Sequence, residues 1–359
     1  MGYRTISLFS GCGGLDLGAE EAGAEVRACL EWDRTACETL SANFHAEVLN
    51  RDIRTTSSEE LLNAARVEPG DYELLIGGPP CTPFSKSGYW LDYKREGRDP
   101  DASLLQDYTR VLAETRPKAF LLENVYGLAY KNRRTTLERL LREITEAGYV
   151  HNVNLESVAP SCVINAADYG VPQLRQRLII LGLRKDVARS QPIRLPEATH
   201  QGPHERRKAV GSLPPHITAG EAIGDLACRH DLAEPTESVN GKWGHLLPAI
   251  PPGENYLHFT DRGGGESLFE WRSRYWTFLL KLDPARPSST IQANPGPYVG
   301  PFHWDNRRLR TLELQRLMGF VTDTYGLAGD RRSIQRQLGN AVPPLLAKQM
   351  VGHLLGYIS

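Results

Sequence analysis

Short apolar runs alternate with helical segments through the first half of this 359-residue chain, and this alternation constrains the fold more than any other feature. The runs predicted as strands cover residues 5–9, 26–30, 74–76, 119–122 and 178–183. Helices are predicted over residues 15–22, 35–44, 104–115 and 135–147, and another begins at Ser57, which has capping-box spacing to Glu60. Because strands alternate with helices of this length, we expect an α/β fold with a mostly parallel sheet that helices cover on both faces.

The alternation stops near residue 186. From there to residue 304 the chain is rich in Pro, Gly, His and Trp and has weak periodicity, which indicates a smaller, loop-rich domain. Helical patterns return over residues 311–318 and 344–357. We therefore expect a first domain over residues 1–185, a second domain over residues 186–304, and a segment 305–359 that returns to pack on the first domain.

The bulk composition is that of an ordinary soluble globular protein, with 40% hydrophobic and 24% charged residues. No apolar run reaches the ~20 residues of a membrane helix, and the N-terminal strand lacks the layout of a signal peptide. We therefore expect a cytoplasmic protein without membrane contact. The six cysteines form no Cys-x-x-Cys pair and no tight Cys/His cluster, so neither a disulfide framework nor a metal site is expected.

Basic residues gather in short clusters, although the formal net charge is only -1. That net charge alone does not favour a general nucleic-acid-binding protein. The clusters comprise Lys131, Arg133 and Arg134; Arg206, Arg207 and Lys208; Arg307, Arg308 and Arg310; and Arg331, Arg332 and Arg336. A solvated helix face or loop explains each cluster equally well, and only the fold decides whether they share one surface.

A glycine-rich turn, Phe9-Ser10-Gly11-Cys12-Gly13-Gly14, follows the first predicted strand. Glycines at the end of a strand let the backbone approach a ligand closely. The dinucleotide fingerprint Gly-x-Gly-x-x-Gly fails here, because its third glycine would fall on Asp16. A cofactor loop and a purely structural tight turn both remain open.

Acidic residues follow the next two strands, at Glu31 and Asp52. A carboxylate at the tip of the second strand can accept hydrogen bonds from ribose hydroxyls, and Trp32 could offer an apolar face to an adenine. A surface acid beside a core aromatic would explain either acid alone, but two acids at successive strand ends favour a bound ligand.

Cys81 follows the rigid turn Gly78-Pro79-Pro80 at the carboxyl end of a predicted strand, where open α/β sheets bind their ligands. A lone cysteine is usually a small buried hydrophobe, and only its thiolate is a nucleophile. The segment from Lys86 to Pro100 is polar, basic and punctuated by glycine, which suits a mobile loop that closes over a substrate.

Two further motifs carry charged side chains. Glu123, in Glu123-Asn124-Val125, again lies at a strand end and could act as an acid. Arg175 and Arg177 share one face of an extended segment that begins at Gln173, and two arginines on one side would form a clamp for an anion or a carbonyl. An edge-strand salt bridge is the alternative.

Together these segments resemble the cytosine-5 methyltransferase family. Six motifs match in family order over nearly the whole chain: Phe9–Gly14, Gly78–Cys81, Glu123–Val125, Gln173–Arg177, Arg308–Phe320 and Gln337–Pro344. The resemblance implies a Rossmann-like methyltransferase domain, a target-recognition domain over residues 186–304, and DNA (cytosine-5-)-methyltransferase activity of the bacterial restriction-modification type. One departure is Thr82, which stands where the family commonly has glutamine.

The resemblance also implies S-adenosylmethionine as the methyl donor, S-adenosylhomocysteine as its product, and no metal. The implied cofactor contacts are Phe9, Gly11, Gly13, Gly14, Glu31, Trp32, Asp52, Ile53, Pro79, Leu104 and Asn340.

In the implied reaction, Cys81 attacks carbon 6 of a cytosine that has been flipped out of the duplex. Glu123 would hold or protonate ring nitrogen 3, and Arg175 and Arg177 would bind the ring carbonyl and the sugar-phosphate nearby. Contacts with DNA are expected from Ser85, Lys86, Arg272, Arg274 and Lys281.

The expected partner is double-stranded DNA, bound by a monomer, and a cognate restriction endonuclease could act on the same site. A tRNA cytosine-5 methyltransferase shares these motifs, but the long second domain with its Trp and Arg residues favours DNA. A catalytically silent DNA-binding protein on the same scaffold is disfavoured because Cys81, Glu123, Arg175 and Arg177 are all retained. A nicotinamide oxidoreductase is disfavoured by the broken glycine fingerprint.

Overall fold

The computed structural model describes residues 2–80, 103–130, 134–188, 192–202, 213–271 and 275–359. Two compact units are present in the chain. The first comprises Met1–Asn165, Gln176–Glu197 and Val342–Ser359, and the second comprises Ala166–Arg175 and Ala198–Ala341. None of the helices in these described ranges is both long enough and apolar enough to cross a membrane.

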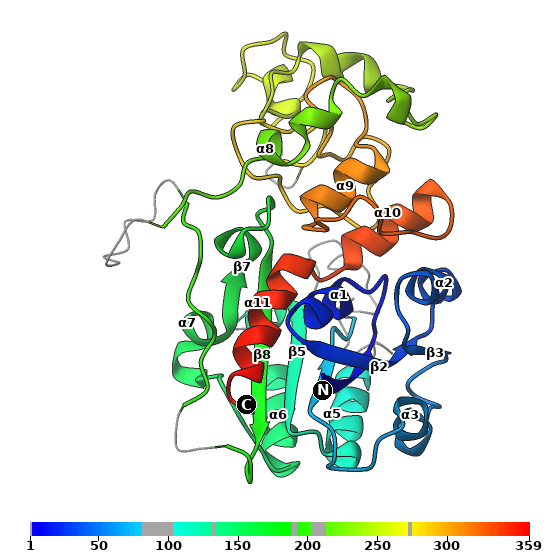
Figure 1. Ribbon diagram of the computed structural model, residues 1–359. Coiled ribbons are helices and arrows are strands. Elements are labelled where there is room, and N and C mark those ends of the chain that lie inside the picture. Colours follow the sequence, from blue (N-terminus) through cyan, green and yellow to red (C-terminus); the bar gives the residue numbers. More distant parts are fainter. Residues whose placement is uncertain (1, 81–102, 131–133, 189–191, 203–212, 272–274) are drawn as a thin grey trace. The chain divides into compact units, whose positions relative to one another are not determined.

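The first unit is built on an eight-stranded sheet (Figure 1). The strands are β1 (Tyr3–Leu8), β2 (Ala24–Glu31), β3 (Glu47–Asn50), β4 (Leu74–Gly77), β5 (Ala119–Val125), β6 (Tyr149–His151), β7 (Val163–Asn165) and β8 (Gln176–Arg184). Their order is β3-β2-β1-β4-β5-β8-β6, and β7 pairs with β8 off this path. The first five strands in that order are parallel, whereas β8 runs antiparallel to β5, β6 and β7. The prediction of an α/β fold with a mostly parallel sheet is therefore confirmed.

Helices cover both faces of this sheet (Figure 1). They are α1 (Gly14–Glu21), α2 (Arg34–Asn43), α3 (Ser58–Ala65), α5 (Leu104–Thr115), α6 (Arg134–Glu146), α7 (Val158–Cys162) and α11 (Pro344–Leu355), with the short 3-10 helices η3 (Tyr126–Ala129) and η5 (Leu155–Ser157). The predicted capping box of Ser57 and Glu60 begins α3. Helix α11 packs against α1, and Gly18 permits this close approach because a side-chain carbon there would collide with the Pro344 carbonyl.

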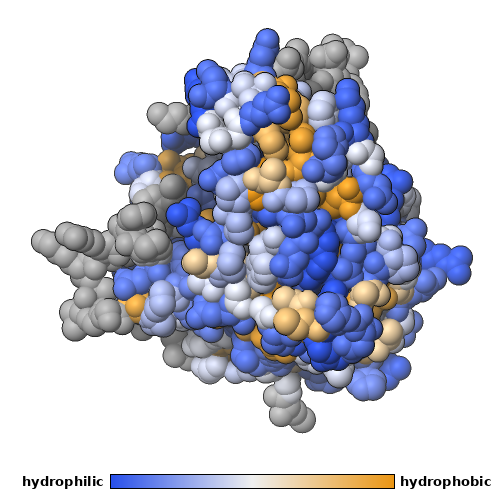
Figure 2. All heavy atoms as spheres, turned by 90° about the horizontal axis from the view of Figure 1, so that it is seen from above, coloured by the Kyte–Doolittle hydropathy of each residue, from blue (hydrophilic) through white to orange (hydrophobic). Residues whose placement is uncertain are grey.

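The second unit is rich in loops. Its helices are α8 (Ala219–Ile223), α9 (Thr311–Leu317) and α10 (Arg331–Asn340), with the 3-10 helices η6 (Ala166–Tyr169), η7 (Gly224–Leu226), η8 (His230–Leu232), η9 (Gly244–Ala249) and η10 (Tyr256–Phe259). Part of its core is a cluster of buried apolar residues drawn from η9, η10 and the segments around Leu279 and Phe302. Figure 2 shows that the visible surface of the molecule is mainly hydrophilic, with apolar side chains in small, separate patches.

The predicted boundary at residue 305 is wrong, because residues 305–341 belong to the second unit and only Val342–Ser359 return to the first. The reason is a buried set of polar contacts made by Arg310. Its guanidinium donates to the carbonyl oxygens of Leu226 and Arg229 and pairs with Glu237, at N–O distances of 2.8–3.0 Å. These bonds hold the start of α9 to the rest of the second unit.

The boundary predicted at residue 186 is also wrong. Ala166–Arg175 belong to the second unit, and the residues up to Glu197 belong to the first.

Candidate active site

The glycine-rich turn that follows β1 is held by Glu31 at the end of the neighbouring strand β2. Glu31 Oε2 accepts a hydrogen bond from the Gly11 amide (2.8 Å), and Oε1 accepts from the amides of Trp32 (2.9 Å) and Asp33 (2.8 Å). Phe9, Gly11 and Gly13 all have positive φ angles, so the backbone of the turn is left-handed at three positions. A carboxylate has roughly four lone-pair sites, so Glu31 keeps about one acceptor site for a ligand.

A buried polar group lies directly beneath this turn. The hydroxyl oxygens of Ser7 and Ser10 are 2.8 Å apart, and the Cys29 thiol donates to Asp16 Oδ1 at 3.5 Å. Asp16 is fully buried in the first turn of α1, and burial raises its pKa to about 6. In the sequence, Asp16 stands out only as the residue that breaks the glycine fingerprint. Its position two residues after the last glycine was the one signal that could have marked it as a support of the turn.

Three further predicted cofactor residues, Trp32, Asp52 and Ile53, follow the ends of β2 and β3. Trp32 is 73% exposed, and the Asn50 amide donates to its carbonyl oxygen (2.9 Å). Asp52 is paired with the Arg54 guanidinium, which lowers the pKa of its carboxyl group. Ile53 is buried at the same turn, and Leu104 is buried at the start of α5.

Glu123 and Arg177 form an ion pair at the carboxyl end of β5. Arg177 Nε lies 2.7 Å from Glu123 Oε1, and both side chains are largely buried. The pair crosses between β5 and β8, because Arg177 lies opposite Val125 in the antiparallel register. Burial lowers the pKa of Arg177, although the negative charge of Glu123 opposes this effect. The salt bridge considered as an alternative for the arginine motif is therefore present for Arg177.

The turn that leads into Cys81 lies beside this ion pair. The Asn124 amide donates to the Pro79 carbonyl oxygen (3.2 Å), and a side-chain carbon at Gly78 would lie 3.2 Å from Glu123 Oε2. Glycine at position 78 therefore leaves room for the Glu123 carboxylate. Cys81 lies outside the described residues, and so do the predicted DNA contacts Ser85, Lys86, Arg272 and Arg274.

Arg175 does not join Arg177, and its predicted role as a substrate clamp is wrong. It belongs to the second unit and is only 1% exposed. Its Nη2 atom donates to the carbonyl oxygens of Gly339 (2.8 Å) and Ala341 (2.9 Å) at the end of α10. The guanidinium is thus used to hold the backbone of that segment.

The prediction that Lys281 contacts DNA is also wrong. It is 4% exposed, and its Nζ atom donates to the Ile250 carbonyl oxygen (2.7 Å) and to Asn306 Oδ1 (2.6 Å). A buried ammonium group that is saturated by internal acceptors cannot contact a phosphate or a base. Asn340, predicted as a cofactor contact, is the exposed last residue of α10 in the second unit.

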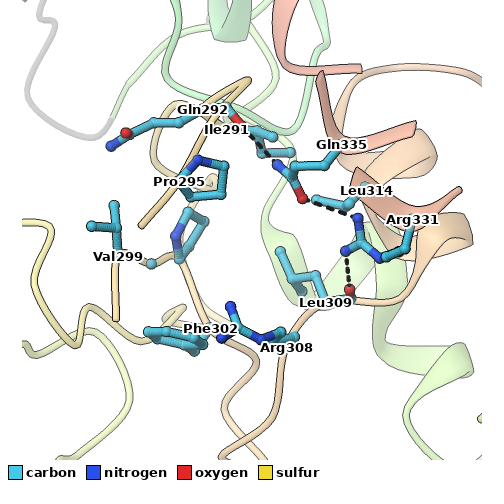
Figure 3. Close-up of a pocket in the computed structure, with 12 residues that line it drawn as sticks. Ile291, Gln292, Pro295, Val299, Phe302, Arg308, Leu309, Leu314, Arg331 and Gln335 are labelled. Carbon is cyan, nitrogen blue, oxygen red and sulfur yellow. Dashed lines mark hydrogen bonds between the residues drawn. The ribbon is translucent and has the colours of Figure 1, made fainter. Parts of the chain in front are cut away.

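The second unit contains a small pocket between the segment Ile291–Phe302 and the helices α9 and α10 (Figure 3). The Arg331 guanidinium donates to the Leu309 carbonyl oxygen and to Gln335, and the Gln335 amide donates to the Gln292 carbonyl oxygen. The pocket has a volume of about 40 Å³.

Comparison with known proteins agrees with these features. The family model described as "C-5 cytosine-specific DNA methylase" matches residues 3–355. The Type II methyltransferase M.SacI of Streptomyces achromogenes is 45% identical over 98% of this chain and 93% of its own length. The Type II methyltransferase M.NgoFVII of Neisseria gonorrhoeae is 31% identical over 95% of this chain and 83% of its own length.

Two solved structures share the fold. One is a protein encoded within a prophage of E. coli, with a TM-score of 0.66, 23% identity and 99% coverage of both chains. The other is a DNMT2 of Spodoptera frugiperda, with a TM-score of 0.61, 15% identity and 99% coverage of both chains. The family match, the identity to the curated relatives and the shared fold together show that the chain belongs to the C-5 cytosine-specific DNA methylase family, and that it is a DNA cytosine-5 methyltransferase, as the order of its motifs predicts.

Proposed function

We propose that this enzyme methylates carbon 5 of a cytosine that is flipped out of a specific duplex DNA sequence, through a covalent adduct of Cys81 at carbon 6. The observation that carries the proposal is the ion pair of Glu123 and Arg177 beside the turn that leads into Cys81. A carboxylate and a guanidinium at this place can hold the edge of a pyrimidine ring next to a nucleophile.

The strand ends of the first unit fit S-adenosylmethionine as the methyl donor. A side-chain carbon at Gly11 would meet no atom of the described residues within 4 Å, so the turn has room on that side among them. The exposed Trp32 indole suits the adenine, and the remaining acceptor site of Glu31 suits a ribose hydroxyl. Phe9, Gly13, Gly14, Asp52, Ile53, Pro79, Leu104 and Asn340 remain proposed contacts. S-adenosylmethionine supplies an electrophilic methyl group when it is bound.

The residues of this chain would then do four things. The Cys81 thiolate forms a bond to carbon 6 of cytosine, which makes carbon 5 nucleophilic. Glu123 holds a proton at ring nitrogen 3 and so neutralises the charge that this attack creates. Arg177 orients Glu123 and faces the ring carbonyl. Once carbon 5 carries the methyl group, a water molecule takes the proton of carbon 5, the Cys81 thiolate leaves, and the proton at ring nitrogen 3 returns to Glu123, which restores the aromatic ring.

The relatives M.SacI and M.NgoFVII carry the name Type II methyltransferase. We propose by analogy with that name that the enzyme modifies a site that a cognate endonuclease would cut, and we propose separately that it acts as a monomer. The sites that it modifies are found by bisulfite sequencing of unmethylated genomic DNA after incubation with the protein and S-adenosylmethionine. Methylation at one repeated sequence is the expected result, whereas methylation of tRNA alone would overturn the DNA assignment.

Cys81→Ser tests the covalent route. We expect this variant to lose methyl transfer while its dissociation constant for S-adenosylmethionine stays near that of the wild type. A duplex that carries 5-fluorocytosine at the mapped site should trap the wild type, but not the variant, as a denaturation-resistant complex. The matched control is Cys228→Ser, which alters an exposed cysteine of the second unit and should leave both readouts unchanged. Full activity of Cys81→Ser would refute the covalent mechanism.

A further inference from the structure

An acidic residue stands where the dinucleotide fingerprint has its third glycine. That glycine lets the first helix pack closely on the sheet, but position 16 of this chain is an aspartate. Asp16 lies in the first turn of α1, and its side chain is fully buried. A buried carboxylate is costly because its charge loses hydration, and the proposed function gives this one no role. Its charge acts first on whatever binds at the glycine-rich turn, which ends two residues before it.

The surroundings of Asp16 leave its charge poorly compensated. Oδ1 accepts a hydrogen bond from the Cys29 thiol (3.5 Å), which is a weak donor, and Oδ2 has no hydrogen-bond partner among the described residues. Burial raises the pKa of Asp16 to about 6, and the side chains of Ser7 and Cys29 oppose this effect without supplying a positive charge. Asparagine would fill the same volume without the cost of a buried charge. The carboxylate is therefore a candidate for a functional role.

The other ionisable groups near the turn do not supply an equivalent charge. Burial raises the pKa of the Cys12 thiol to about 12 and that of the Cys29 thiol well above its usual range, so both stay neutral. Glu20, one helical turn further along α1, is exposed, so solvent and salt screen its charge. Glu31 accepts hydrogen bonds from three backbone N–H groups at 2.8–2.9 Å, which partly offset its charge.

Without Asp16 the start of α1 would favour an anion. A helix carries a partial positive charge at its N-terminus, and dinucleotide-binding folds place a pyrophosphate there. The N-cap of α1 is Gly13, whose lack of a side chain leaves the free N–H groups of the first turn uncapped. A full negative charge on Asp16 exceeds this partial positive charge and reverses the sign of the field. S-adenosylmethionine carries a positive sulfonium, whereas the sulfur of S-adenosylhomocysteine is neutral, so only the methyl donor gains from this reversal.

We propose that Asp16 is a specificity-determining residue of the cofactor site, and that its buried negative charge makes the site prefer the cationic methyl donor over the product with its neutral sulfur. The inference rests on the proposed function, because it takes S-adenosylmethionine as the ligand of the glycine-rich turn. Asp16 acts through the electrostatic field across the turn and not by contact, since its side chain is fully buried. A product that bound as tightly as the donor would compete for the site after each methyl transfer.

Calorimetric titration of the full-length enzyme with each ligand, at pH 8 where Asp16 is ionised, tests this preference. Asp16→Asn removes the charge at nearly constant volume. The dissociation constant of this variant for S-adenosylmethionine should rise roughly 10-fold, as expected for one charge pair at an effective dielectric constant near 20, while that for S-adenosylhomocysteine stays within about 2-fold of the wild type. Asp16→Ser, a second neutral variant, should change the ratio of the two constants in the same direction.

The matched control is Glu20→Gln, which removes one exposed negative charge from the same helix. It should leave the ratio of the two dissociation constants within about 2-fold of the wild type, because an exposed charge is screened. If Asp16 only supported the turn, both ligands would be weakened equally. A wild-type ratio in Asp16→Asn and Asp16→Ser would therefore overturn the inference, whatever the change in either constant alone. Failure of the wild type to bind S-adenosylmethionine would instead refute the cofactor assignment of the proposed function.

Discussion

At the scale of single residues, Asp16 makes the stability of the first unit depend on pH. Burial raises its pKa to about 6, from 3.8 for an exposed aspartate. Between these two values the unfolded chain loses the proton and the folded protein keeps it, so stability falls as the pH rises. Above about pH 6 the buried Asp16 is ionised in the folded protein, so the full free-energy cost of burying its charge lowers the stability. We expect Asp16→Asn to stabilise the protein by on the order of 2–3 kcal/mol at pH 8, and by little at pH 4.

Denaturant unfolding of Asp16→Asn and of the wild type at several pH values measures this difference. A matched control is Asp33→Asn, which alters a carboxylate that is partly exposed and caps α2, and so lacks the burial penalty. An equal effect of Asp16→Asn at pH 4 and at pH 8 would show that packing, and not charge, is responsible.

Glu31 is the residue whose loss should weaken the cofactor site most directly. Glu31→Ala removes three hydrogen bonds that hold the turn after β1 and also removes the proposed ribose acceptor. A hydrogen bond to a charged group is worth about 1.5–3 kcal/mol, so the dissociation constant for S-adenosylmethionine should rise by roughly 10- to 100-fold. Calorimetric titration measures it, with the exposed Glu38→Ala of α2 as the control. An unchanged constant would remove Glu31 from the proposed site.

At the scale of elements, the close packing of α1 on α11 depends on Gly18. A side-chain carbon at this position would collide with the Pro344 carbonyl and the Lys348 amide of α11. Gly18→Ala should therefore destabilise the protein by about 1–3 kcal/mol, since backbone must move. Gly352→Ala on α11 is the matched control, because its new carbon would lie 3.8 Å from Ala22 Cβ, an ordinary contact. That change should be neutral or stabilising by up to ~1 kcal/mol. The urea concentration at the midpoint of unfolding measures both effects and should be lower for Gly18→Ala than for Gly352→Ala. Equal midpoints would contradict the packing argument.

The sequence predicted the buried strands β1, β2, β4, β5 and β8 but not β3, β6 and β7. These three strands have only three or four residues each and are partly exposed, so they lack the apolar run that marks a buried strand. Glu31 is the last residue of β2 and Glu123 lies two residues before the end of β5, as expected from the predicted strands, and their roles in a site stay predictions. The same reasoning failed for Arg175, since β8 begins only at Gln176 and the alternation of faces does not extend to residue 175. The predicted DNA contact of Lys281 was wrong because a charged side chain was assumed to be exposed. Its ammonium group is instead buried and donates hydrogen bonds to internal carbonyl groups.

At the scale of the whole molecule, the chain enters the second unit twice and returns to the first unit twice. The first unit therefore cannot be obtained as one continuous piece of sequence, and the predicted domain of residues 1–185 would lack α11. Leu346, Met350, Val351 and Leu354 of that helix are all buried. Burial of four such side chains is worth about 6–12 kcal/mol. This is comparable with the entire stability of a typical domain, about 5–15 kcal/mol.

We accordingly expect a protein that ends at residue 341 to lose cooperative unfolding and to lose binding of S-adenosylmethionine, although it retains every proposed cofactor residue. A milder version of the same experiment is Leu354→Ala, which should cost about 2–5 kcal/mol. Gln349→Ala, on the exposed side of α11, should stay within about 0.5 kcal/mol of the wild type. Thermal unfolding with and without S-adenosylmethionine measures both effects. If the shortened protein bound S-adenosylmethionine with wild-type affinity, α11 would have to be an appendage, and the first unit would be complete without the last segment of the chain.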